Sequence, residues 1–129
     1  MNKILIEVSV GELLDKISIL EIKQEKIKDP EKLKFINDEH SILKDQLDNN
    51  VKSDEKLNTL FQCLKDINAK LWVIEDDKRL CEKNYDFAEN FIKLSRDVHF
   101  LNDDRAKIKL EINIHTGSKI KEIKEYTSY

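Results

Sequence analysis

Hydrophobic residues recur every three or four positions along most of the chain, which is the spacing of helices that bury one face. The clearest run comprises Leu57, Leu60, Leu64, Ile67, Leu71 and Ile74. Together with start and stop signals, this spacing predicts helices over about residues 10–28, 30–47, 53–83 and 87–115. Residues 3–8 read as a short extended arm, and residues 118–129 as a charged tail.

Polar residues and the single proline set the expected helix ends. Ser9 followed by Glu12 has the form of a capping box, so the first helix should begin after Ser9. Pro30 suits the first turn of the second helix, because its missing N–H is not needed there. We expect Ser53 and Asp86 to cap the third and fourth helices.

The helix lengths predict an all-α fold. The third and fourth helices should each be about 45 Å long, whereas the first two are much shorter. We therefore expect one domain over residues 1–129, a bundle of four antiparallel helices in which a short hairpin packs on a long one. The short hairpin should leave part of the apolar surface of the long hairpin uncovered. Since a second copy is the simplest cover, we expect a homodimer.

Composition and charge exclude several classes of protein. The net charge is −3, and the 23 basic residues are mixed with 26 acidic ones, so no basic stripe indicates a nucleic-acid partner. No apolar run approaches the length of a membrane span, and the first residues do not resemble a signal peptide. We expect a cytoplasmic protein with no membrane association. Cys63 and Cys81 share one expected helix roughly 27 Å apart and should be buried, unbridged thiols.

The apolar stripe of the fourth helix turns polar along its length. After Leu94, Val98 and Leu101, the same face presents Asn102, Arg105, Lys109 and Asn113. This pattern is unusual because burying an unpaired charge is costly. Polar residues also enter the inward faces of the first and third helices. The candidate ligand-binding residues are Arg105, Lys109, Asn102, Asn113, Glu21, Gln24, Glu75 and Arg79.

The two inward cations should not meet acids of the third helix. If the long hairpin turns near Tyr85, Arg105 lies level with Lys65, and Lys109 lies level with Phe61. Their partners must then come from the first two helices, the tail, another subunit or a bound anion. In the first two helices, the candidates are Asp15, Glu21 and Gln24.

Three interpretations of these residues remain open. They can form a structural network or become exposed near the bundle end. They can instead line a pocket for a phosphate or carboxylate, with Arg105 binding in bidentate fashion and Lys109 as a point charge. Or they can belong to a surface for a protein partner, on which Trp72, Asp76 and Arg79 form a second face of the third helix.

No motif fixes a reaction, so whether the protein is an enzyme stays open and its catalytic residues unknown. The run Glu75-Asp76-Asp77 is acidic, but adjacent helical residues point 100° apart, so these do not converge on a metal. No phosphate loop or activated nucleophile is recognisable. We expect no metal or cofactor. An enzyme acting on an anionic metabolite would use Glu21 or Glu75 as acid or base.

The first helix resembles the opening helix of the all-helical chorismate mutases. The resemblance covers about 20 residues around Gly11-Glu12-Leu13-Leu14-Asp15-Lys16-Ile17. Those dimeric enzymes hold a dicarboxylate between Arg, Lys, Glu and Gln side chains inside a helical bundle. The first helix here has no arginine where that family places one.

A longer resemblance, over nearly the whole chain, is to a bacterial family known only as a domain of unknown function. It is carried by residues 11–23 (GELLDKISILEIK), 71–79 (LWVIEDDKR) and 102–113 (NDDRAKIKLEIN), with the Gly117-Ser118 tail. The resemblance implies no activity, although the occurrence of members near glycan-building genes implies a link to surface-polysaccharide metabolism. The three blocks include most of the inward polar residues.

Overall fold

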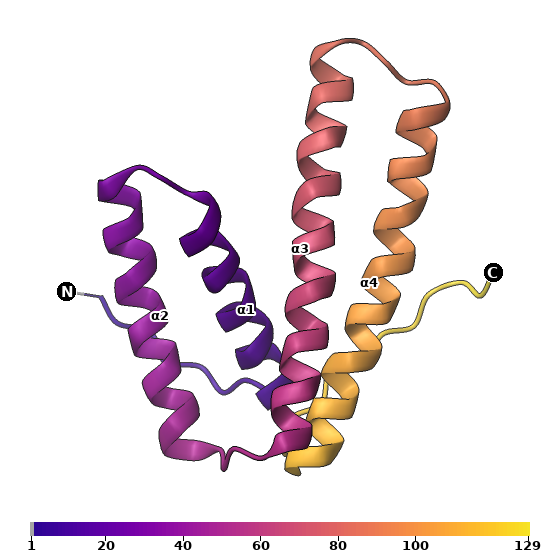
Figure 1. Ribbon diagram of the computed structural model, residues 1–129. Helices are drawn as coiled ribbons and strands as arrows, with labels where there is room; N and C mark the ends of the chain where they lie inside the picture. Colours follow the sequence, from indigo (N-terminus) through magenta and orange to yellow (C-terminus); the bar gives the residue numbers. More distant parts are fainter. Residues whose placement is uncertain (1) are drawn as a thin grey trace.

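The computed structural model describes residues 2–129, in which four helices and no strand occur. The helices are α1 (Val10–Lys26), α2 (Pro30–Asn50), α3 (Glu55–Lys83) and α4 (Glu89–Thr116). Figure 1 shows two hairpins that meet at their lower ends, with α3–α4 rising well beyond α1–α2. The predicted all-α fold, with a short hairpin against a long one, is confirmed.

The helix α1 is the centre of the fold. It packs against each of the other three helices, and α3 packs against α4 along the long hairpin. Within residues 2–129, the backbone of α2 comes close to that of α1 alone. The short hairpin therefore contacts the long one mainly through α1, and only over the lower part of α3–α4 (Figure 1).

The largest hydrophobic cluster lies where α1 meets the lower ends of α3 and α4. Its buried members are Leu14, Leu57, Leu60, Leu64 and Ile112, which come from all three helices. Leu64 and Ile112 have no exposed surface. Fully burying one such side chain contributes about 1.5–3 kcal/mol, so this cluster fixes how α1 sits on the long hairpin.

Two of the predicted helix starts are confirmed. The Ser9 hydroxyl oxygen accepts a hydrogen bond from the Glu12 amide and caps α1. Pro30 is the first residue of α2, whose cap is the Asp29 carboxylate. Both arrangements satisfy an amide that the helix itself cannot pair.

Several other predicted helix ends are wrong by one to three residues, including the end of α1, which is at Lys26 and not near residue 28. The cap of α3 is Asp54 rather than Ser53, and its carboxylate accepts from the Leu57 amide at 2.7 Å. The helix α4 begins at Glu89 because the Asp86 carboxylate accepts from the Ala88 amide and holds that segment in a turn. The helix α2 continues to Asn50, whose side chain donates to the Gln46 carbonyl.

The upper part of the long hairpin is covered by neither α1 nor α2 (Figure 1). Large apolar side chains remain open to solvent there, including Val73, which is 49% exposed, and Leu80, which is 51% exposed. The expected uncovered part of the long hairpin is therefore present.

The prediction that both thiols are buried is wrong for Cys63, which is exposed, and right for Cys81. Cys63 lies about 100° around α3 from Leu64, which takes the core position.

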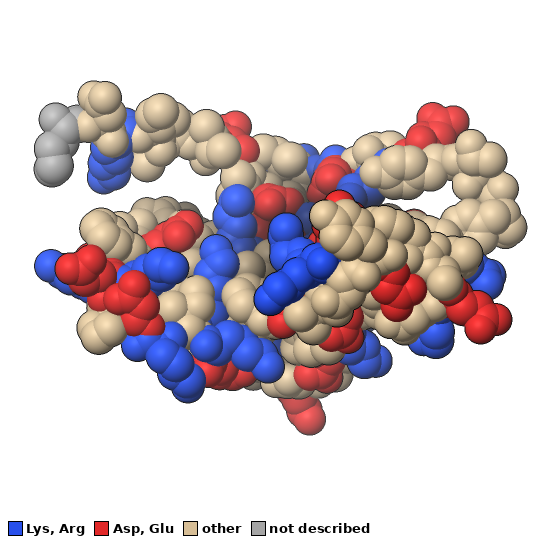
Figure 2. Space-filling model, turned by 90° about the horizontal axis from the view of Figure 1, so that it is seen from above, with Lys and Arg blue, Asp and Glu red and all other residues tan. Residues whose placement is uncertain are grey.

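The surface carries both charges in close mixture. Figure 2 shows Lys and Arg interspersed with Asp and Glu over the face seen from above, with no large patch of one sign. Of the helices between residues 2 and 129, none combines the length and hydrophobicity that crossing a membrane requires.

Candidate functional site

Lys109 is buried and surrounded by carboxylates. Its ammonium nitrogen lies 2.7 Å from a Glu12 oxygen, 3.2 Å from one of Glu122 and 3.7 Å from one of Asp15. These acids come from α1 and from the C-terminal tail. The helices α1 and α4 and the C-terminal tail therefore meet at the Lys109 ammonium.

The carboxylates keep Lys109 charged. Burial by itself lowers the pKa of a lysine, but the hydrogen bonds and ion pairs with Glu12, Asp15 and Glu122 outweigh burial and raise the pKa of Lys109 above its usual value. The hydrogen bond from Lys109 likewise lowers the pKa of Glu122. Because acids outnumber the cation here, an added anion would have to displace one of them.

Gly11 lets α1 approach α4 closely. Its amide donates to the Asn113 side-chain oxygen at 2.7 Å, and this bond is buried. A Cβ at Gly11 would lie 2.6 Å from the Lys109 carbonyl oxygen and 3.0 Å from the Asn113 side-chain oxygen. The close approach thus needs glycine for space, and Asn113 satisfies an otherwise unpaired amide of the first turn of α1.

A second set of polar contacts extends from α1 through α3 to α4. The amide nitrogen of Asn68, a buried residue of α3, donates to Asp15 and to the Ser18 hydroxyl, both at 2.8 Å. The Asn68 oxygen accepts from Arg105 at 3.1 Å, and Arg105 also donates to Asn102 at 2.7 Å. Asp15 therefore links this set to Lys109.

We call these contacts the polar network: Glu12, Asp15, Ser18, Asn68, Asn102, Arg105, Lys109, Asn113 and Glu122. Its residues come from α1, α3, α4 and the tail, and Lys109 and Asn113 flank Ile112 of the hydrophobic cluster on α4. Its two cations differ in their surroundings. Lys109 is paired with three carboxylates. Arg105 forms no ion pair among residues 2–129, and it donates to two amide oxygens instead.

The structure brings four of the eight predicted site residues into the polar network: Asn102, Arg105, Lys109 and Asn113. The others lie elsewhere. Glu21 pairs with His40 and Lys65, and Gln24 donates to Asn37. Glu75 and Arg79 are exposed on α3, and the contacts of the network do not extend to them.

Of the remaining network residues, Asp15 was expected as a partner of the inward cations, and it lies 3.7 Å from the Lys109 ammonium. Glu12, Ser18, Asn68 and Glu122 were missed as site candidates by reasoning from the sequence. Asn68 had a readable signal, because it lies four residues after Leu64 and three before Leu71, at a core position of α3. Glu12 was recognised only as part of a capping box. Glu122 had no local signal, because its role depends on where the tail crosses α4.

Two hollows of the structure lie outside the network. The larger one is between α3 and α4, and the smaller one, of about 110 Å³, is lined by residues of α1, α2 and α3 including Glu21. Neither is lined by Arg105 or Lys109. Within residues 2–129, no three histidine, cysteine or acidic side chains are placed to hold a metal ion together.

The fold and the network define a class of small all-α proteins in which buried polar contacts join three helices. The chain belongs to a family described as "Family of unknown function (DUF6165)", which it matches over residues 4–129. This confirms the resemblance to a family of unknown function. No curated protein and no solved structure matches the chain.

Proposed function

We propose that this protein is a binding module for a small anion carrying a carboxylate or phosphate, with Arg105 as the residue that binds it. The supporting observation is the pairing of Arg105 with two neutral amide oxygens and with no carboxylate within 4.0 Å among residues 2–129. A half-buried guanidinium that is not neutralised attracts an anion.

The donor geometry supports the same proposal. A guanidinium has five N–H donors, and the hydrogen bonds to Asn68 and Asn102 use two of its nitrogens. These two bonds fix the plane of the Arg105 guanidinium, so its remaining donors are oriented before a ligand arrives. Pre-orientation lowers the entropy cost of binding. Lys109 keeps α1 and the tail in place and is not the primary anion donor.

The decisive comparison is between Arg105 and the exposed Arg96 of the same helix. We would follow thermal unfolding of the wild type, Arg105→Gln and Arg96→Gln with phosphate, nucleotides, nucleotide-sugars and small dicarboxylates. Chloride would be adjusted to a constant ionic strength, because screening alone alters stability. A ligand at 100 times its dissociation constant adds about 2.7 kcal/mol, which is a shift of several degrees.

We expect one of these anions to raise the melting temperature of the wild type and of Arg96→Gln, and to leave Arg105→Gln unchanged. The side-chain amide signals of Asn68 and Asn102 in nuclear magnetic resonance spectra should move with the same ligand. If no anion acts while Arg105→Gln itself loses stability, the polar network is structural, as the first interpretation of the sequence has it.

A homodimer is the second part of the proposal. It is supported by the apolar side chains that the upper α3–α4 hairpin leaves exposed, since a second copy would cover them. Sedimentation of the purified chain at micromolar concentrations tests this part independently of anion binding. A monomer at 100 times the concentration of the binding assay would contradict it.

A further inference from the structure

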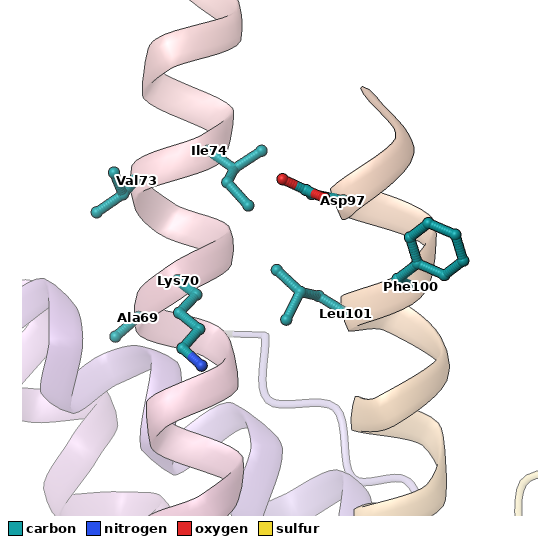
Figure 3. A pocket seen from close by; sticks show the side chains of 7 residues that line it. All are labelled: Ala69, Lys70, Val73, Ile74, Asp97, Phe100 and Leu101. Atoms are coloured by element: carbon teal, nitrogen blue, oxygen red, sulfur yellow. The ribbon is translucent and has the colours of Figure 1, made fainter. Parts of the chain in front are cut away.

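An open groove runs between α3 and α4 above the region that α1 covers (Figure 3). Its volume is about 640 Å³. Its apolar lining comprises Ala69, Val73, Ile74, Phe100 and Leu101. The two charged residues of its lining lie toward opposite ends, Lys70 at the lower end on α3 and Asp97 at the upper end on α4 (Figure 3).

The N-terminal arm is a second apolar feature, and no other part of residues 2–129 covers it. Residues 2–9 form no helix or strand, and Ile4, Leu5 and Ile6 are 85%, 78% and 74% exposed. Figure 2 shows the arm standing away from the helices. Three consecutive exposed aliphatic side chains are unusual on a protein surface without a partner.

The arm and the groove are complementary in chemistry. Alternate residues of an extended segment share one face, so Lys3, Leu5 and Glu7 point in the same direction. This face carries a cation, an aliphatic group and an anion. The groove presents Asp97, an apolar floor and Lys70 in that order. Leu5 would pack on the floor while Lys3 meets Asp97 and Glu7 meets Lys70.

The spacing of the charges also agrees. Four residues of extended chain place Lys3 and Glu7 about 13 Å apart. Across the groove, Lys70 on α3 lies lower than Asp97 on α4 (Figure 3). Helices in contact are about 8–10 Å apart, so the two charged positions are separated by at least that distance, which four residues of extended chain can span.

The arm of one copy is too short to reach its own groove. Ser9 is buried, and the bond between Gly11 and Asn113 fixes the start of α1 near the lower end of α4. Leu5 can extend at most about 13 Å from Ser9. From Asn113 to the groove at Phe100, the distance along α4 is about 20 Å. An arm that fills this groove must therefore come from another copy.

We propose that two copies exchange N-terminal arms, each arm lying in the α3–α4 groove of the other. This rests on the homodimer of the proposed function and names its interface. The exchange is reciprocal, so it closes as a dimer instead of continuing into a filament. Exchange of a terminal segment adds contacts without a change in either fold.

The test is sedimentation of the full chain with one substitution on each side of the interface. Leu5→Asp and Val73→Asp each place a charge in the contact and should weaken dimerisation on the order of 100-fold. Ile42→Asp, at an exposed position of α2, is the matched control and should remain dimeric. Because all three positions are exposed, circular dichroism should show unchanged helix content.

A cross-link shows whether the contact joins different copies. Leu5→Cys protein and Val73→Cys protein, each also carrying Cys63→Ser to remove the exposed thiol, would be mixed and oxidised. We expect a disulfide-linked heterodimer. A dimer that withstands Leu5→Asp overturns the arm exchange and leaves the homodimer standing. A chain that is monomeric throughout overturns both, whereas the anion titration of Arg105 is unaffected by either result.

Discussion

At the scale of single residues, two cations one turn apart on α4 have opposite surroundings. Lys109 is enclosed by the carboxylates of Glu12, Asp15 and Glu122, whereas Arg105 is held by the amide oxygens of Asn68 and Asn102. Removing charges from water is costly, and the carboxylates offset that cost at Lys109. Among residues 2–129 no carboxylate compensates Arg105 in this way, which is why the proposed ligand is assigned to it.

Gly11→Ala provides a test of the close approach between α1 and α4. Helix propensity alone predicts that alanine stabilises a helix by up to about 1 kcal/mol relative to glycine. The structure predicts the opposite sign, a loss of about 1–3 kcal/mol, because the new Cβ would overlap the Lys109 carbonyl. Urea unfolding measures the difference directly.

Lys26→Ala, at an exposed position of the same helix, is the control for this substitution. It should stay within about 0.5 kcal/mol of the wild type. If Gly11→Ala proves as stable as the wild type or more so, the helices lie farther apart than the contact between Gly11 and Asn113 implies.

At the scale of helices, the apolar spacing and the caps predicted the elements well. Ser9 and Pro30 begin their helices where expected, because each satisfies or removes an amide locally. The register of the long hairpin was less predictable. Arg105 donates to Asn68, which lies three residues after Lys65, the residue expected to be level with it. The turn at Asp86, which delays α4, has no counterpart in the helical spacing.

The candidate site was predictable only in part, for a related reason. The inward direction of Asn102, Arg105, Lys109 and Asn113 follows from the period of one helix. Their partners do not, because pairing across helices depends on how α1 is set against α4. The close contact at Gly11 fixes how α1 is placed against α4, and the spacing of apolar residues along one helix does not predict such a contact.

The C-terminal tail is held by a charge whose effect can be measured. Because Lys109 donates a hydrogen bond to Glu122, the pKa of Glu122 lies below its ordinary value of 4.5. Carbon-detected titration of the Glu122 carboxyl should show this, and Lys109→Met should return the pKa toward 4.5. Lys124→Met, which removes a weaker neighbour of Glu122, should have the smaller effect.

The sign of the pH dependence follows from the lowered pKa. The contact favours the docked tail at pH values above 4.5, the pKa expected for a free glutamate, and is lost as the pH falls through the lower pKa of the docked form. Relative to the intrinsic exchange rate at each pH, protection of the amides at residues 118–124 should therefore fall only in acid. Exchange that is equally fast at neutral pH would show that Glu122 does not hold the tail.

At the scale of the whole molecule, the structure has two parts. The lower part, which we call the base, is held together by contacts among three helices, and the upper part of the α3–α4 hairpin protrudes from it. The hydrophobic cluster and the polar network both lie where α1 meets the lower parts of α3 and α4. Above them, the hairpin is held by its own two helices (Figure 1). Contacts that only two helices provide give a lower local free energy of unfolding.

Hydrogen exchange followed along α3 and α4 should reveal this division. Amides near the hairpin turn, at residues 79–91, should exchange faster than those at 57–64 and 108–112, because less buried surface protects them. Where arms are exchanged, residues 69–74 and 97–101 should also be protected in the wild type and released in Leu5→Asp, while the turn is unchanged. Equal exchange along both helices in every variant would mean that base and hairpin unfold as one unit.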